Sequence, residues 1–127
     1  MENNLEDLKV LIVDDSKTML RIIGNVINQI GIKKVKSAGD GSQAFELFSD
    51  SEFDVILTDW NMPVMDGLTF VKKVRAVNDD IPIVMITTEG GKEQVITALK
   101  AGVNNYIVKP FDAKTLKEKL ENILYYR

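Results

Sequence analysis

The 127-residue sequence contains no cysteine and no histidine. Disulfide bonds, thiolate or imidazole metal ligands, and catalysis by a cysteine or histidine side chain are therefore excluded. Any metal ion must be held by oxygen atoms. The sequence also lacks an apolar run long enough to cross a membrane, and residues 1–7 are too acidic and polar for a signal peptide. We therefore expect a cytoplasmic protein that does not bind membranes.

The sequence has no excess of positive charge. Lysine and arginine number 16 against 19 aspartates and glutamates, a formal net charge of -3, which argues against a general nucleic-acid binder. The composition, 45% hydrophobic and 28% charged, is that of an ordinary soluble globular protein. The length suits one domain, 1–127, without a linker or an output domain, and we expect a monomer.

Short apolar runs alternate with segments of helical periodicity. We expect strands over five ranges: 8–13, 34–38, 53–58, 81–87 and 104–108. A helix is expected after each strand, with starts near Ser16, Asp40, Asp66, Lys92 and Asp112. Five alternating β-α units predict an α/β fold whose parallel sheet is covered by helices on both faces. Right-handed crossovers then leave only a few doubly wound strand orders.

Asp59 follows the most uniformly apolar strand, in the stretch from Phe53 to Gly67. Val55, Ile56 and Leu57 show no polar alternation, as in a strand buried on both faces. Asp59 is therefore expected at the carboxyl end of that strand, where open α/β sheets bind ligands. A lone aspartate at such a position is more often a turn or helix N-cap residue. The other strand ends decide between the two interpretations.

The other strands end in residues that complement Asp59. Asp14 and Asp15 follow the first strand, Thr87 ends the fourth and Lys109 follows the fifth. Carboxylates ~4 Å apart repel by about 1 to 4 kcal/mol, depending on the local dielectric. A proton or a cation must compensate, and oxygen donors favour a hard cation such as Mg²⁺, with Lys109 as a fixed positive charge.

This combination suits a phosphoryl group. A metal ion and an ammonium can neutralise its oxygens while a threonine hydroxyl donates a hydrogen bond. The only nucleophile is a carboxylate, so Asp59 can attack a phosphoryl donor and carry an acyl phosphate. Alone, Lys109 would be interpreted as a surface lysine and Thr87 as a strand-end hydroxyl. Their joint placement at the strand ends argues against that interpretation.

These motifs resemble the receiver domains of two-component response regulators from about Lys9 to Leu124. The shared elements are Asp14-Asp15, Asp59 before Trp60-Asn61-Met62-Pro63, Asp66-Gly67, Thr87 and Lys109-Pro110-Phe111. The resemblance implies a flavodoxin-like fold with strand order 2-1-3-4-5 and a cis Lys109-Pro110 bond. It implies Asp59 as phosphoacceptor, with Thr87 and Lys109 holding the phosphoryl group. It also implies that Mg²⁺ is bound by Asp15, Asp59 and the Asn61 backbone carbonyl, with Asp14 acting through water.

The chain is more closely similar to the single-domain chemotaxis regulators of the CheY type. The similarity lies in Thr87 to Gly91 and in Ala98 to Phe111. It implies that Tyr106 is a switch residue and that Asn61 and Glu89 tune autodephosphorylation. It also implies three partners, which are a chemotaxis histidine kinase as phosphodonor, a flagellar motor switch protein and a phosphatase. The sequence departs from that type at Ser16-Lys17 and in a longer polar N-terminus.

The output of such a protein must be a surface. We expect it on the helix from Lys92 to Lys100, the strand at Tyr106 and the helix from Asp112. Its residues would be Lys92, Val95, Leu99, Lys100, Tyr106, Lys114, Lys117 and Lys119. This locally basic face suits an acidic amphipathic segment. Alternatively, the lysines only solvate two amphipathic helices.

We expect a phosphorylation-gated signalling domain that is not a turnover enzyme, and three other functions are alternatives to it. A phosphorelay intermediate would use the same site. An Mg²⁺-dependent aspartyl phosphatase typically carries a second acid two residues after its nucleophile, where this chain has Asn61. A flavin-binding module on the same fold is disfavoured, because Asp14 and Asp15 would repel a cofactor phosphate.

Overall fold

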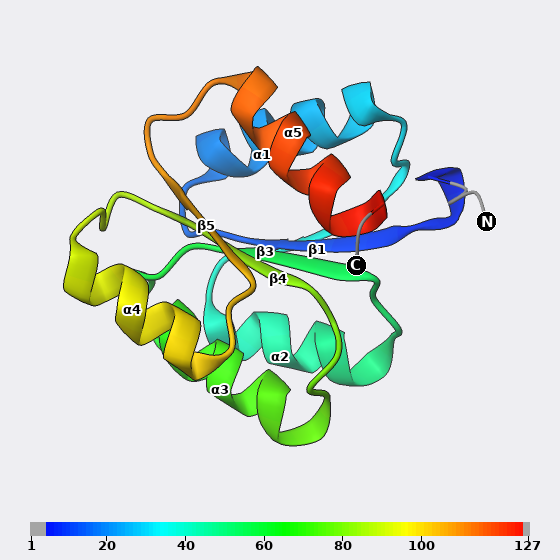
Figure 1. Cartoon of the computed structure of the whole chain (residues 1–127). Coiled ribbons are helices and arrows are strands. Elements are labelled where there is room, and N and C mark those ends of the chain that lie inside the picture. Colours follow the sequence, from blue (N-terminus) through cyan, green and yellow to red (C-terminus); the bar gives the residue numbers. More distant parts are fainter. Residues whose placement is uncertain (1–4, 126–127) are drawn as a thin grey trace.

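Five strands alternate with five helices in the computed structural model, which describes residues 5–125 (Figure 1). A 3₁₀ turn, η1 (Leu5–Asp7), precedes the first strand. The strands are β1 (Lys9–Val13), β2 (Lys34–Ala38), β3 (Val55–Thr58), β4 (Ile83–Thr87) and β5 (Asn105–Val108). The helices are α1 (Lys17–Ile30), α2 (Gly41–Asp50), α3 (Gly67–Val77), α4 (Lys92–Ala101) and α5 (Ala113–Tyr125).

The strands form one parallel sheet in the order β2-β1-β3-β4-β5, which confirms the predicted fold and strand order. Helices α1 and α5 cover one face, and α2, α3 and α4 cover the other (Figure 1). The Lys109-Pro110 bond is cis, as predicted. Within residues 5–125, no helix combines the length and the apolar composition needed to span a bilayer.

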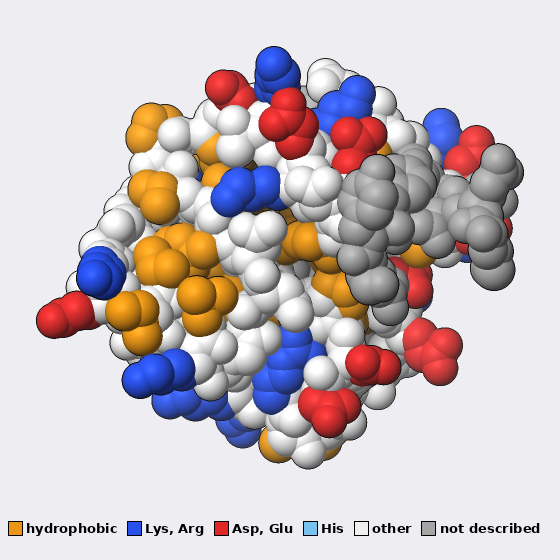
Figure 2. All heavy atoms as spheres, in the orientation of Figure 1, with side chains coloured by type: hydrophobic (Ala, Val, Ile, Leu, Met, Phe, Trp, Pro, Cys, Tyr) orange, Lys and Arg blue, Asp and Glu red, His pale blue; other side chains and the backbone are white. Residues whose placement is uncertain are grey.

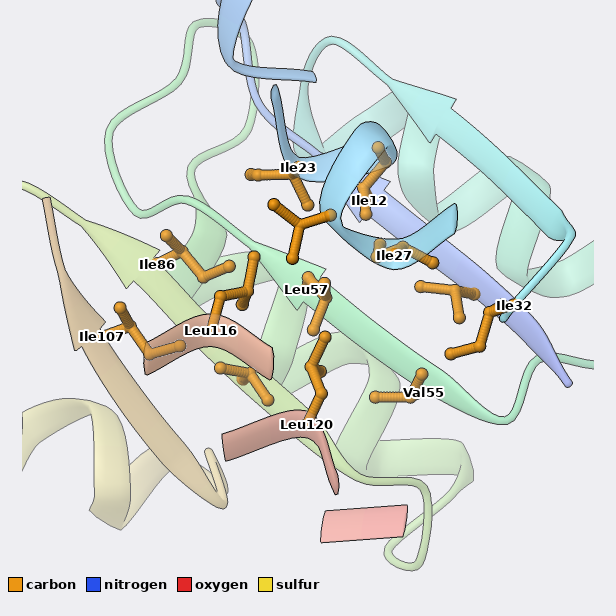
Figure 3. Close-up of a cluster of buried hydrophobic side chains, with 13 residues drawn as sticks. Ile12, Ile23, Ile27, Ile32, Val55, Leu57, Ile86, Ile107, Leu116 and Leu120 are labelled. Carbon is orange, nitrogen blue, oxygen red and sulfur yellow. The ribbon is translucent and has the colours of Figure 1, made fainter. Parts of the chain in front are cut away.

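Alternate residues of the central strands build two separate cores. Val10 and Ile12 of β1 face the α1 and α5 side, while Leu11 and Val13 face the α2 and α3 side. On the first side, isoleucines of α1 meet Leu57 and the leucines of α5 (Figure 3). All four residues of β3 are buried, as the unbroken apolar run predicted. This rigid centre fixes the place of the residue that follows β3.

The predicted helix starts and stops are confirmed in their hydrogen bonds. Ser16 Oγ accepts a bond from the Met19 N–H, and Asp66 and Asp112 cap their helices in the same way. Asp40 caps α2. Gly31 ends α1 with a φ of 111°, in the left-handed region that favours glycine.

Several apolar residues of the helices are exposed. Ile22 is 42% exposed, Val77 69% and Leu99 47%. Val77 is the last residue of α3, and the only fully buried residue of α4 is Ala98. The buried stripe of each helix is therefore narrower than its apolar spacing suggests. Helix α4 therefore packs against the rest of the molecule through little apolar surface.

Candidate functional site

The predicted site residues lie at the carboxyl edge of the sheet because all five strands are parallel. Sheet hydrogen bonds continue one residue beyond the strands and fix these positions. The Asp14 N–H donates to Ala38 O at 3.1 Å and the Asp59 N–H donates to Val13 O at 2.9 Å. The Lys109 N–H donates to Thr87 O at 2.8 Å. The backbone of the site is therefore part of the rigid sheet.

Three carboxylates gather at this edge. One oxygen from each of Asp14, Asp15 and Asp59 lies within 4.8 Å of the others. Asp14 is 1% and Asp59 is 9% exposed, whereas Asp15 faces solvent. Lys109 Nζ lies 2.7 Å from Asp14 Oδ2 and 3.0 Å from Asp59 Oδ2. One ammonium thus links the two buried carboxylates and leaves Asp15 open to solvent.

Burial sets the protonation of this cluster. It raises the pKa of the Asp14 carboxyl group, and the hydrogen bonds from Lys109 and Ser16 offset only part of this effect. Burial alone would lower the pKa of the Lys109 ammonium, but its hydrogen bonds to Asp14 and Asp59 and their negative charges outweigh burial and raise the pKa. Lys109 therefore remains charged, as a fixed positive group beside Asp59.

The donor set fits a hard divalent cation. Asp14 Oδ1 accepts the Ser16 N–H at 2.9 Å and Asp59 Oδ1 accepts the Trp60 N–H at 2.6 Å. A carboxylate oxygen has a second lone pair, so both residues can still bind a metal ion. Together with exposed Asp15, these oxygens form a group that could hold Mg²⁺. Trp60 lies directly beside this group.

The β3–α3 loop is held against Asp59 by a glycine that the sequence indicated only as a helix start. The Gly67 N–H donates to Trp60 O at 2.7 Å, and a Cβ at this position would lie 1.9 Å from the Asp59 carbonyl oxygen. Only a residue without a side chain permits this approach. In the same loop, exposed Val64 has a φ of 69°. The loop is therefore tightly constrained around the Asp59 backbone.

Thr87, Glu89 and Tyr106 form a second, connected group. Thr87 is fully buried, and its hydroxyl oxygen accepts a hydrogen bond from the Glu89 N–H at 3.3 Å. The Tyr106 hydroxyl donates to the Glu89 carbonyl oxygen. Burial, with the negative charges of Glu89 and Asp59, raises the pKa of Tyr106. Thr87 and Tyr106 thus both form hydrogen bonds with the backbone of Glu89.

Asn61 and Glu89, predicted to tune dephosphorylation, are hydrogen-bonded to each other. Asn61 Nδ2 donates to Glu89 Oε2 at 3.1 Å. Asn61 is exposed and Glu89 is partly buried. Their side chains therefore join the loops that follow β3 and β4 at the mouth of the site.

The predicted partner surface is exposed over most of its residues and is more apolar than expected. Figure 2 shows apolar side chains gathered over the α4 and β5 side of the molecule, with basic side chains around them. Leu99, Ile96 and Val108 are 47%, 41% and 44% exposed. Ile96 and Val108 are not among the residues predicted for this surface, because an apolar residue in a helix or strand gives no signal of exposure in the sequence.

The lysines predicted for the partner surface differ in their exposure and in their contacts. Lys119 is only partly exposed, and its Nζ donates to Tyr106 O at 3.1 Å and to Asn105 Oδ1 at 3.3 Å. Both acceptors are neutral oxygens, so these contacts hold the Lys119 side chain in place without pairing its charge. Lys114 lies 4.0 Å from Glu118 on the same helix. Lys92, Lys100 and Lys117 are exposed, and Val95 is partly buried.

Arg75, which is not among the predicted site residues, connects the end of α4 to neighbouring segments through three hydrogen bonds. Arg75 Nε donates to Gly102 O at 3.0 Å and its Nη2 donates to Asn104 Oδ1 at 2.9 Å. Its Nη1 donates to Asn78 O at 3.2 Å. Burial lowers the pKa of Arg75, and the charges of Asp79 and Asp80 partly offset this effect. Arg75 therefore ties the C-terminal end of α4 to α3.

We expect Asp15→Asn to weaken Mg²⁺ binding about tenfold, equivalent to ~1.4 kcal/mol, because one of three charged ligands is lost. The stability of the fold should change little, since the Asp15 side chain is exposed. A Mg²⁺ titration followed by Trp60 fluorescence measures the affinity. Asp79→Asn, another exposed aspartate, is the control and should bind Mg²⁺ as the unchanged protein does. An unchanged affinity in Asp15→Asn would contradict this assignment.

Comparisons with known proteins agree on one family. The family model described as "Response regulator receiver domain" matches residues 10–121. Chemotaxis protein CheY1 of Helicobacter pylori is 59% identical over 120 residues, which are 92% of this chain and 97% of the relative. The chemotaxis protein CheY homolog of Campylobacter jejuni is 58% identical over 120 residues, 92% of each chain.

Solved structures of the same kind are also similar. Chemotaxis response regulator CheY4 of Vibrio cholerae superposes with a TM-score of 0.86 at 37% identity, over 91% of this chain and 98% of the other. The receiver domain of Francisella response regulator 1452 gives a TM-score of 0.86 at 35% identity, over 95% and 98%. Fold and sequence therefore point to the same family.

Proposed function

The chain belongs to the response regulator receiver domain family, and from this premise we propose that it is a chemotaxis response regulator that accepts a phosphoryl group on Asp59. The observation that carries the proposal is the position of Asp59 at the end of β3. Its carboxylate lies beside those of Asp14 and Asp15 and 3.0 Å from the ammonium of Lys109. A phosphoryl acceptor needs this combination of a nucleophilic carboxylate, a metal site and a fixed cation.

In the proposed reaction, a carboxylate oxygen of Asp59 attacks the phosphorus of the donor. The bond from phosphorus to the leaving group breaks, and the leaving group departs with the electron pair. Asp14, Asp15, Asp59 and the Asn61 backbone carbonyl would hold Mg²⁺, which would neutralise charge on the phosphoryl oxygens. The Lys109 ammonium turns from Asp59 to a phosphoryl oxygen. The Thr87 hydroxyl, whose oxygen accepts the Glu89 N–H, moves to donate to another.

The same movement would carry the signal to the partner surface. Thr87 and Tyr106 both bond to the backbone of Glu89, so a shift of Thr87 toward the phosphoryl group changes the space and the partner available to Tyr106. We propose that Thr87 and Tyr106 form a switch with two conformations. Phosphorylation of Asp59 and binding of the partner would both shift the equilibrium between these conformations. Asn61 and Glu89, at the mouth of the site, would control the entry of the water that hydrolyses the acyl phosphate.

The proposed partners follow from the family and from the surface. A chemotaxis histidine kinase would supply the phosphoryl group, and a phosphatase would help to remove it. The apolar patch of α4 and β5, with Lys92 and Lys100 on α4, suits an acidic amphipathic segment of the flagellar motor switch. We propose that the protein acts in the cytoplasm as a monomer. It would not turn over a substrate beyond its own phosphorylation and slow dephosphorylation, and it would bind no nucleic acid.

The direct test is phosphorylation by a small donor. Incubation with acetyl phosphate and Mg²⁺ should add one phosphoryl group to the protein, measured as a gain in intact mass. Addition of a chelator should prevent the gain, because the carboxylate cluster then repels the donor. The absence of any gain with Mg²⁺ present would contradict the proposed function.

A further inference from the structure

A pocket of about 410 Å³ lies beside the carboxylate cluster, on the side away from Lys109. Asp14 and Asp15 form one wall, so the pocket is continuous with the proposed metal site. The carboxyl end of β2 and Gln43 of α2 form the other wall. Since β2 and β5 are the two outer strands of the sheet, this pocket and Lys109 lie on opposite flanks of Asp14.

Lys17 also lines this pocket and belongs to the Ser16-Lys17 pair, one of the two places where the sequence departs from the CheY type. It begins α1, where the helix dipole disfavours a positive charge. No acidic side chain occupies the first turn of α1, and the ion pairs found among residues 5–125 do not include Lys17. Lys17 is thus an exposed cation, placed against the local helix preference, in the same pocket as Asp14 and Asp15, and this placement points to a role at the carboxylate site.

The backbone around Lys17 is fixed relative to the carboxylates. The Ser16 N–H donates to Asp14 Oδ1 at 2.9 Å, and Ser16 Oγ caps the helix that Lys17 begins. Lys17 therefore lines the same pocket as Asp14 and Asp15, with an exposed side chain. With Mg²⁺ bound, the three carboxylates, the Lys109 ammonium and the metal ion carry no net charge, so one further cation beside them would favour the approach of an anionic phosphodonor.

We propose that Lys17 is a specificity-determining residue that favours phosphodonors of high negative charge, such as doubly charged acyl phosphates. The inference rests on the proposed function of Asp59. During transfer the Asp59 oxygen bonds to phosphorus, the bond between phosphorus and the acyl oxygen breaks, and a carboxylate leaves with the electron pair. Lys17 takes no part in these bond changes and acts on the approach and binding of the anion.

The test compares two donors in charge variants. Acetyl phosphate carries two negative charges, whereas phosphoramidate carries one fewer at neutral pH because its nitrogen is protonated. The rate constant of phosphorylation per unit donor concentration is measured by Trp60 fluorescence and intact mass. The variants are Lys17→Gln and Lys17→Glu. Lys33→Gln is the matched control, since Lys33 is exposed and precedes β2, whereas the pocket lies at the carboxyl end of that strand.

We expect Lys17→Gln to lower the rate constant with acetyl phosphate about 3- to 5-fold at low salt, and Lys17→Glu to lower it further. The loss with phosphoramidate should be smaller, about 2-fold. The effect should fade at ~1 M ionic strength, where the Debye length is about 3 Å. The affinity of the two Lys17 variants for Mg²⁺ should be unchanged or higher, because a cation near the metal site has been removed. The rate constants of Lys33→Gln should equal those of the unchanged protein.

Equal losses with both donors, a loss that persists at high salt, or no loss in Lys17→Glu would overturn the inference. Weakened Mg²⁺ binding in the Lys17 variants would also overturn it, because Lys17 would then act on the metal site. A failure of the unchanged protein to accept a phosphoryl group from either donor would instead overturn the function of Asp59.

Discussion

Replacing Asp59 with asparagine should abolish phosphorylation by acetyl phosphate. The amide has the shape of the carboxylate but is not a nucleophile, so no acyl phosphate can form. Intact mass measured after incubation with acetyl phosphate and Mg²⁺ should show no phosphoryl adduct. The fold should be retained, because Lys109 keeps its 2.7 Å contact with Asp14.

Asp50→Asn is the matched control, since it removes an exposed carboxylate at the end of α2. It should gain a phosphoryl group as the unchanged protein does. A phosphoryl group found on another aspartate of Asp59→Asn would contradict the assignment, most clearly if it lay on Asp14 or Asp15. Loss of labelling in Asp50→Asn as well would indicate a general effect of charge.

Gly67→Ala should destabilise the protein by about 3 kcal/mol, at the upper end of the cost of overpacking. The new Cβ would lie 1.9 Å from the Asp59 carbonyl oxygen and 3.0 Å from the Trp60 Cα. Both are backbone atoms and cannot move aside as a flexible side chain can. The free energy of unfolding, measured by urea titration, should fall, and phosphorylation should slow because the Asp59 backbone is displaced.

Gly24→Ala provides the control for this prediction. Gly24 lies inside α1, and nothing lies within 4 Å of a Cβ at that position. Alanine there should therefore stabilise the helix by roughly 0.5 to 1 kcal/mol. The same chemical change should thus have opposite signs at the two positions. A stabilised Gly67→Ala protein would show that the β3–α3 loop does not press on Asp59 as described.

The features that the sequence predicted well are those with a local signal. Unbroken apolar runs predict buried parallel strands, and the carboxyl ends of such strands must share an edge. The convergence of Asp14, Asp59 and Lys109 therefore follows from the strand assignment. Side chains that cap helices, such as Ser16 and Asp66, act within three residues and are equally visible in the sequence.

Contacts between distant segments were not predictable in the same way. Lys119 looks like any exposed helix lysine until β5 supplies the carbonyl oxygen of Tyr106 as its partner. Arg75 meets Gly102 only because α3 and α4 pack side by side on one face. An apolar helix residue is buried only where another segment packs over it, and the sequence does not show which segment does so. Leu99 is an apolar helix residue that remains exposed.

The most direct test of the whole mechanism is the affinity for an acidic amphipathic segment of the motor switch, with and without beryllofluoride, which mimics the acyl phosphate on Asp59. We predict an affinity gain of about 5- to 150-fold, the range of a typical allosteric coupling. The footprint should lie on α4, β5 and α5, around Leu99 and Tyr106. Equal affinities in the two states would contradict the switch, and a footprint around Ala44 to Phe48 of α2 would contradict the assigned surface.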